Sequence, residues 1–163
     1  MGVRNCKDIG ENLQKIISRL MANDELVKLL YYTDKDPYGG APLTAELKKT
    51  EIYNKLIKII PRVETREDAR SVVVVQVIGG NRNSENSEFR NVNVRVEVFV
   101  PLTQWLIKDT NLRPFAILGE IQSSLNEKTI NGLGKMSGGD FELSFLTDEM
   151  SCYTQEYRIV SYE

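Results

Sequence analysis

The chain has 163 residues, of which 41% are apolar, a composition typical of one ordinary globular domain. Lysine and arginine number 21 and aspartate and glutamate number 23, so the formal charge is −2 and no basic surplus favours non-specific binding to nucleic acids. The sequence contains no histidine, which excludes Ser-His and Cys-His nucleophile pairs and removes the commonest nitrogen ligand of zinc.

The two cysteines and the longest apolar run indicate the class of protein. Cys6 and Cys152 lie near opposite ends of the chain, with no CxxC pair, and are too few for a disulfide scaffold or a closed zinc site. We therefore expect a reduced intracellular protein. The longest unbroken apolar run is Val72–Val75, whereas a membrane helix needs about 20 residues, so we expect a soluble protein without a membrane partner.

The first third of the chain predicts helices. Over residues 7–21, apolar side chains recur at spacings of three and four, as they do on one face of an amphipathic helix. A second, short helix is expected next, and either Asn23 or Asp24 suits its N-cap. A third apolar group at 52–60 is compatible with a helix that ends at Pro61, because proline disfavours α geometry in the residue before it.

The middle of the chain predicts strands instead. Val72–Ile78 is a β-branched run too short for a typical helix, and it predicts a central strand covered on both faces. In Val92–Val100, valine alternates with other residues, which predicts a strand with one buried and one wetter face. No helical crossover separates the two runs, so we predict an antiparallel hairpin with a long mobile loop at 79–91.

The last third predicts one helix and a second hairpin. Pro101 ends the preceding strand, and the segment 114–125 begins with a proline that suits the first turn of a helix. Gly119 interrupts this helix at a cost of about 1 kcal/mol relative to alanine, which suggests close approach of another backbone. Apolar residues at period two over 141–145, and mixed alternation over 153–162, predict the two strands of a closing hairpin.

Together these elements predict a single domain over residues 1–163. Its residues 1–61 form a mainly helical N-terminal region, and its residues 72–163 form a sheet with one helix. The expected fold class is α+β, with helices packed on a mainly antiparallel four-stranded sheet.

Two segments resemble parts of ligand-binding motifs without completing them. The glycine-rich stretch 132–139 has Thr129 where a P-loop needs its first glycine, and it follows a predicted helix instead of a strand. The stretch 34–39 begins like a calcium loop, but Tyr38 and Ala45 occupy positions that need oxygen ligands. We therefore predict no cofactor, no metal and no catalytic residue.

Adjacent acids leave one enzymatic alternative open. Asp148 and Glu149, like Glu67 and Asp68, are neighbouring carboxylates of the kind that serve as acid and base when their environments differ. Adjacent acids usually point apart and stay solvated, however, and no serine lies in a GxSxG motif. We therefore predict that the chain is not an enzyme and takes no small-molecule substrate.

Four residues are candidate contacts with a partner protein: Arg82, Phe89, Arg90 and Trp105. The first three lie within the polar connection at 79–91, and loops of that length within compact domains are usually functional or disordered. A plain solvated connection is the alternative. Trp105 either anchors an interface, where aromatic residues are enriched, or covers the core.

Several of these segments resemble the tail terminator and related head-to-tail completion proteins of long-tailed bacteriophages. The similarity lies in the N-terminal helical region with its LLYYTD segment, the alternating strand, the helix and the closing strand. These segments are 29–34, 92–101, 113–125 and 153–159.

The resemblance implies a structural protein of the virion, with a tail-terminator-like fold and no chemistry of its own. Proteins of this kind form a homo-hexameric ring on the finished tail tube, end its polymerisation and present the surface that joins the neck. The resemblance therefore implies the tail tube protein and neck or connector proteins as partners. It also implies passage of DNA through the ring, and a location in the tail-neck region of the virion after synthesis in the host cytoplasm.

Three alternatives remain. Another neck, connector or baseplate component of a phage tail would share the fold and the composition and differ only in its place on the particle. A small carboxylate-dependent enzyme would lose activity when Asp148 and Glu149 are replaced by alanine. A regulatory nucleic-acid binder ranks last, and its binding would depend on salt.

Overall fold

The computed structural model of the chain describes residues 3–59, 70–108, 111–130 and 134–160. Its three main helices follow the apolar spacing of the sequence: α1 (Lys7–Met21), α2 (Asp24–Tyr31) and α4 (Arg113–Leu125). The N-cap of α2 is Asn23, whose side-chain oxygen accepts a hydrogen bond from the Leu26 backbone N–H at 3.0 Å. These predicted helices are therefore confirmed.

Gly119 has a different surrounding from the one predicted. Outside the helix's own backbone, a Cβ at this position would meet no described atom within 4 Å, and the residue is exposed. The predicted close approach of another backbone is therefore wrong, and the structure gives no packing reason for the glycine.

The predicted helix over 52–60 is also wrong within the described residues. Between α2 and the sheet the chain forms the short helices η1 (Pro37–Gly39), α3 (Ala45–Leu47) and η2 (Lys48–Ile52). It then turns at Asn54, whose φ of 54° lies in the left-handed region, and enters strand β1 (Ile57–Lys58). Helical spacing misled here because the buried side chains of Ile52, Leu56 and Ile57 come from the end of η2, a turn and β1 in succession. Ile60 and Pro61 lie outside the described residues.

The main sheet has six strands, in the order β1-β2-β3-β8-β7-β6. Beside β1 they are β2 (Val72–Arg82), β3 (Arg90–Pro101), β6 (Thr129–Ile130), β7 (Gly134–Leu146) and β8 (Met150–Val160). All neighbours are antiparallel except the parallel pair of β1 and β2. The predicted four-stranded sheet is therefore wrong. The additional strands β1 and β6 are two residues long each, too short to give a period in the sequence.

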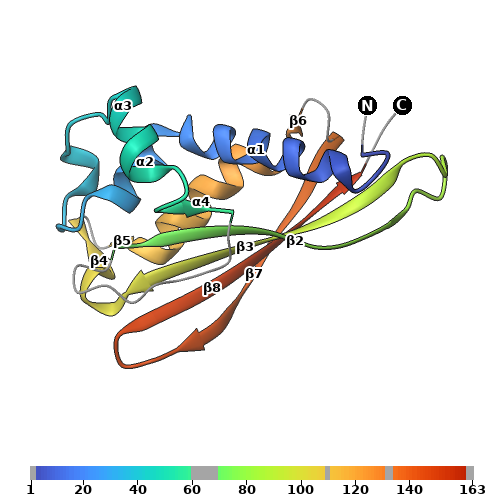
Figure 1. Cartoon of the computed structure of the whole chain (residues 1–163). Coiled ribbons are helices and arrows are strands. Elements are labelled where there is room, and N and C mark those ends of the chain that lie inside the picture. Colours follow the sequence, from blue (N-terminus) through green and yellow to red (C-terminus); the bar gives the residue numbers. More distant parts are fainter. Residues whose placement is uncertain (1–2, 60–69, 109–110, 131–133, 161–163) are drawn as a thin grey trace.

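A separate two-stranded sheet follows β3. After the short helix η3 (Leu102–Gln104), strand β4 (Leu106–Ile107) pairs with β5 (Asn111–Leu112) immediately before α4. The chain is thus a mixed α+β protein, and its described main helices lie together on one face of a strongly twisted sheet (Figure 1).

The core lies between these helices and the sheet. Alternate residues of β2 and β3, such as Val73, Val75 and Val96, are fully buried on the helical face. The other face of the sheet has only a small apolar cluster of Val74, Phe99 and Cys152 at one end. The predicted coverage of β2 on both faces therefore holds only for its first residues, such as Val73 and Val74, whereas Ile78 is exposed.

A buried arginine links α4 to the α2 region. Arg113 has no exposed surface, and its guanidinium donates hydrogen bonds of 2.5–2.8 Å to four backbone carbonyls. The four acceptors are the carbonyls of Leu29, Tyr32, Asp34 and Gln104. Burial lowers the pKa of Arg113, while the charge of Asp34 opposes this shift. The fan of donors fixes the start of α4 against the end of α2.

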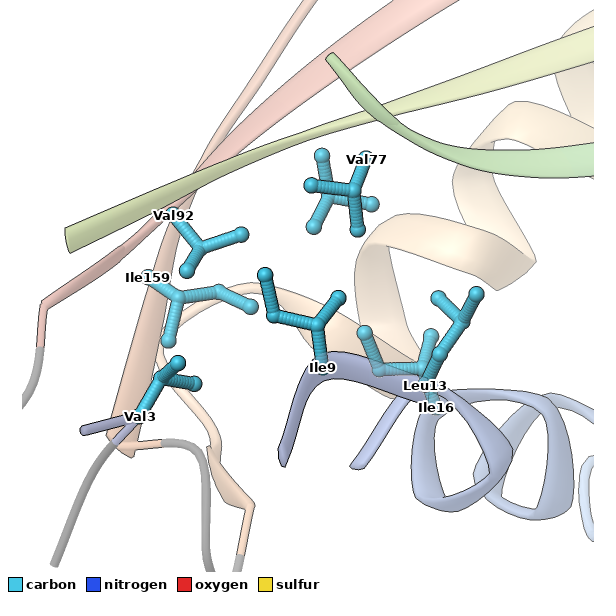
Figure 2. A pocket seen from close by; sticks show the side chains of 8 residues that line it. Val3, Ile9, Leu13, Ile16, Val77, Val92 and Ile159 are labelled. Carbon is cyan, nitrogen blue, oxygen red and sulfur yellow. The ribbon is translucent and has the colours of Figure 1, made fainter. Parts of the chain in front are cut away.

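A small cavity lies beneath the first turns of α1 (Figure 2). Its volume is about 10 Å³, barely enough for one water molecule, and every lining side chain is apolar. The lining residues are Val3, Ile9, Leu13, Ile16, Val77, Val92, Val94 and Ile159. A cavity of this size and lining is a local packing defect and not a ligand site.

Two hairpins extend the sheet at opposite ends (Figure 1). In the β2–β3 hairpin the strands continue through 79–82 and 90–91, so the connection is 83–89, shorter than the predicted loop. In the β7–β8 hairpin the strands are joined by a tight turn at 147–149, which confirms the predicted closing hairpin. Both hairpins reach beyond the helical layer, so their surfaces are candidates for contact with other molecules.

Candidate interaction surface

Strand β7 presents a row of apolar side chains to the surface. Phe141, Leu143, Phe145 and Leu146 are 56%, 49%, 44% and 59% exposed. They belong to the segment 140–146, here called the β7 edge. On its inner side this segment pairs with β8. On its outer side, β6 pairs only with Gly134 and Lys135, and no other described strand adds to it. Open strand edges with apolar side chains are sites where another chain adds.

Aromatic rings continue the apolar surface onto the helical face. The ring of Phe141 lies 6.1 Å from that of Phe115 on α4 and 6.3 Å from that of Tyr153 on β8. The rings of Phe115 and Tyr153 are 5.2 Å apart. Three rings from three elements therefore form one half-exposed aromatic cluster, of the kind that anchors protein interfaces.

On the opposite face of the sheet, Phe145 packs on the small apolar cluster. The ring of Phe145 lies 5.7 Å from that of Phe99. In the strand register, Phe145 of β7 lies opposite Cys152 of β8. Burial raises the pKa of the Cys152 thiol to about 12, so this cysteine stays protonated and unreactive near neutral pH. The apolar surface of the β7 edge thus wraps around both faces of the hairpin.

The part of this hairpin nearest its turn carries only acidic charges. Residues 136–157 contain no lysine or arginine and five carboxylates: Asp140, Glu142, Asp148, Glu149 and Glu156. Three of them, on Asp140, Glu142 and Glu156, line a shallow hollow of about 270 Å³. Glu156 is paired with Arg95 at 3.0 Å. No group of three or more acidic or cysteine side chains in the described part of the chain is arranged to hold a metal ion.

The predicted contact residues lie in two separate places. Arg82 is exposed at the end of β2, and Phe89 is buried in the β2–β3 connection with the Arg4 guanidinium 5.2 Å from its ring. Arg90 begins β3, where its backbone N–H donates to the Val3 carbonyl at 2.8 Å. Phe89 is thus a core residue of the hairpin, and only Arg82 of the three is freely exposed.

Trp105 lies far from the other three, next to the aromatic cluster. Its ring is 6.3 Å from that of Tyr153, and its Nε1–H donates to the Ser151 hydroxyl at 3.0 Å. The side chain is half-buried, so it covers the core and borders the exposed surface at once. Of the predicted contact residues, Trp105 is the one that adjoins the β7 edge.

The exposed apolar surface of the β7 edge is not among the predicted contact residues. The spacing of Phe141, Leu143 and Phe145 predicts a strand and does not by itself indicate exposure. Two signals were available: an apolar row that continues to Leu146, and a stretch of acids without a single basic residue. Asp148 and Glu149 are both exposed in the turn of the hairpin, so they extend this acidic surface.

No helix in the described ranges is long and apolar enough to cross a membrane. Comparison with curated proteins gives no match. The family model of YomW, in contrast, matches residues 23–159, from the start of α2 to the end of the sheet. That family is named after a gene product of the SPBeta phage region of Bacillus, which associates it with bacteriophages. The chain therefore belongs to the YomW family, a phage-associated family.

Proposed function

We propose that this chain is a structural protein of the phage virion that forms a ring on the tail tube, ends its polymerisation and provides the surface that joins the head. The observation that carries the proposal is the exposed β7 edge. An apolar strand edge of this kind is costly to leave in water and is typical of a protein that works in an assembly.

The charge and shape of the chain support the same role. Capping needs a subunit that binds one end of a growing tube and offers a different surface on its other side. The two hairpins project at opposite ends of the sheet and differ in surface, one apolar and acidic, the other polar (Figure 1). A subunit with two unlike ends fits a position between the tail tube and the neck. The resemblance to tail terminators supports this position within the virion.

Location on the particle tests the proposal. Antibodies against the chain are applied to intact phage particles and to isolated tails, and the label is located by electron microscopy. Label at the head-proximal end of the tail is expected. Label at the distal end would assign the chain to the baseplate instead, and particles that carry no label would overturn the virion role. Antibodies preincubated with the purified chain serve as the control for specific labelling.

Another neck or connector component is the second candidate, because it would also be labelled at the head-proximal end. A phage that lacks the chain separates the two roles. Loss of a terminator gives tails of abnormal length, whereas loss of a connector gives tails of normal length that stay unattached to heads. Complementation with the D148A/E149A double variant tests the enzymatic alternative, and full restoration of infectious particles is expected because both acids lie exposed in a turn.

A further inference from the structure

The main sheet has a second open edge, on the side away from the β7 edge. Strand β1 pairs with only Val73 and Val74 of β2. Beyond them, from Gln76 to Arg82, no described strand pairs with the outer side of β2. Among the described residues the sheet therefore has two open strand edges, at which a further strand can add.

The second edge also combines apolar and charged side chains. Ile78 on β2 is 41% exposed, and Tyr53, just before β1, is about equally exposed. The segment 48–58, which includes β1, carries four lysines and one glutamate, and the Lys48 ammonium pairs with Asp24 of α2 at 2.7 Å. Together, residues 53–58 and 76–82 are here called the β2 edge, and Lys55 and Arg82 make it basic.

The charges of the two edges select the way in which copies of the chain can associate. If two β7 edges met, Asp140 and Glu142 of one copy would lie against the same two acids of the other, and like charges across paired strands are destabilising. If a β7 edge met a β2 edge, acids would face basic residues and apolar side chains would face apolar side chains. The head-to-tail arrangement is therefore favoured over the symmetric one.

We propose that the β7 edge of one copy of this chain docks on the β2 edge of a second copy. The proposal rests on the proposed function and deepens it, because a contact between unlike edges leaves one open edge of each kind on every assembly until a ring closes. Phe141, Leu143 and Phe145 supply the apolar contacts. The irregular register between Leu143 and Phe145 divides the edge into two short stretches, which limits uncontrolled strand addition.

Site-specific cross-linking tests which edges meet. On a Cys6→Ser background, Glu142→Cys marks the β7 edge and Ile78→Cys marks the β2 edge, while the native Cys152 is buried and stays unreactive. Each variant alone and their equal mixture are treated with a short bifunctional thiol reagent at high protein concentration. A cross-linked dimer is expected in the mixture only.

Two results would overturn the proposal. Dimers from Glu142→Cys alone would mean that two β7 edges pair symmetrically. No dimer in the mixture, together with a monomeric mass in light scattering, would mean that the β7 edge serves a different protein. Neither result bears on the virion role, which antibody labelling decides, so the failure of this proposal and that of the proposed function are distinguishable.

Charge reversal provides an independent readout with a control. Asp140→Lys is added to the Glu142→Cys protein and is expected to abolish the mixed dimer. Lys55→Glu, added to the Ile78→Cys protein, is expected to restore it. Glu11→Lys, which changes an exposed acid of α1 by the same charge, is the matched control and is expected to leave the yield unchanged. Loss of dimer without restoration by the reciprocal change would refute pairing between these two edges.

Discussion

The two hairpins of the sheet share a topology and differ in how they treat apolar side chains. In the β2–β3 hairpin the one aromatic residue of the connection, Phe89, is buried, and the Asn83 side chain accepts hydrogen bonds from the backbone N–H groups of Glu85 and Asn86. In the β7–β8 hairpin the turn is short and the apolar residues of the β7 edge are exposed. The exposed apolar side chains of these two hairpins therefore lie on a strand edge and not in the longer connection.

The largest effect is expected at the start of α4, the helix that places Phe115 against Phe141 of the β7–β8 hairpin. Arg113→Met removes the donors of four buried carbonyls, and each unsatisfied buried group costs about 1–3 kcal/mol. We expect the free energy of unfolding in urea to fall by about 4 kcal/mol. Phe115 follows two residues later, so near-ultraviolet circular dichroism of the aromatic cluster should weaken as well.

Arg113→Lys is the matched control for this loss. Lysine keeps the positive charge and lacks the planar fork that reaches several acceptors, so its cost should be a large part of the loss seen with methionine. Full stability of the lysine variant would show that charge alone holds α4 in place, and the four carbonyl bonds would then have little weight.

The comparison of the hairpins is sharpened by truncating one phenylalanine in each. Phe89→Ala creates a cavity in the β2–β3 hairpin, and we expect a loss of about 3 kcal/mol in the free energy of unfolding. Phe141→Ala removes a half-exposed ring, so its cost should stay below about 1 kcal/mol. Urea unfolding followed by circular dichroism measures both.

The order of the two variants should be reversed when the yield of cross-linked dimer is measured. Phe141→Ala is expected to weaken cross-linking between the β7 and β2 edges. Phe89→Ala should preserve it under conditions in which the variant is folded. Similar destabilisation by both truncations would erase the distinction between a buried and an exposed aromatic residue on which the comparison rests.

The sequence predicted those elements that are long enough for their apolar pattern to repeat several times. Helix α1 and the β2–β3 and β7–β8 hairpins follow directly from spacings of three and four or of two. The two-residue strands β1 and β6 have no period, and they form because tertiary packing brings them beside longer strands. Tertiary packing also explains why Ile52 and Leu56, four residues apart, are both buried although the chain turns at Asn54 between them.

The candidate surface was harder to predict, for a physical reason. Whether Phe141 is buried depends on how far α4 extends over the hairpin, and the local pattern of β7 is the same in either case. The sequence leaves open whether Trp105 anchors an interface or covers the core, because its neighbours Ser151 and Tyr153 come from β8, which is distant along the chain.

A smaller effect concerns pH at the apolar cluster under Phe145. Burial raises the pKa of the Cys152 thiol from 9.0 to about 12, and the charge of Glu97 acts in the same direction. The folded state therefore favours the protonated thiol, so its contribution to stability is complete below pH 9 and is lost as pH rises from about 9 to about 12.

By pH 10 this loss should amount to about 1 kcal/mol, measured as the difference between urea unfolding at pH 7 and pH 10. Cys152→Ala should show a smaller difference between the two pH values than the unmodified chain. Cys6→Ala is the control, because Cys6 is exposed and its removal should leave the difference unchanged. A thiol reagent should modify Cys6 in the folded chain and Cys152 only after unfolding.

The smallest effect is expected at the base of the β2–β3 hairpin, in the cavity beneath α1 (Figure 2). Val77→Ile adds one methylene group at a half-buried side chain that lines this cavity, and filling apolar space gains at most about 0.8 kcal/mol. Val75→Ile adds the same group two residues earlier, at a fully buried position that does not line the cavity, where overpacking costs about 1–3 kcal/mol. The two substitutions should therefore differ in sign in urea unfolding. Equal destabilisation by both would mean that the base of this hairpin is as tightly packed as its neighbours, and that the contrast between the hairpins lies only in their outer surfaces.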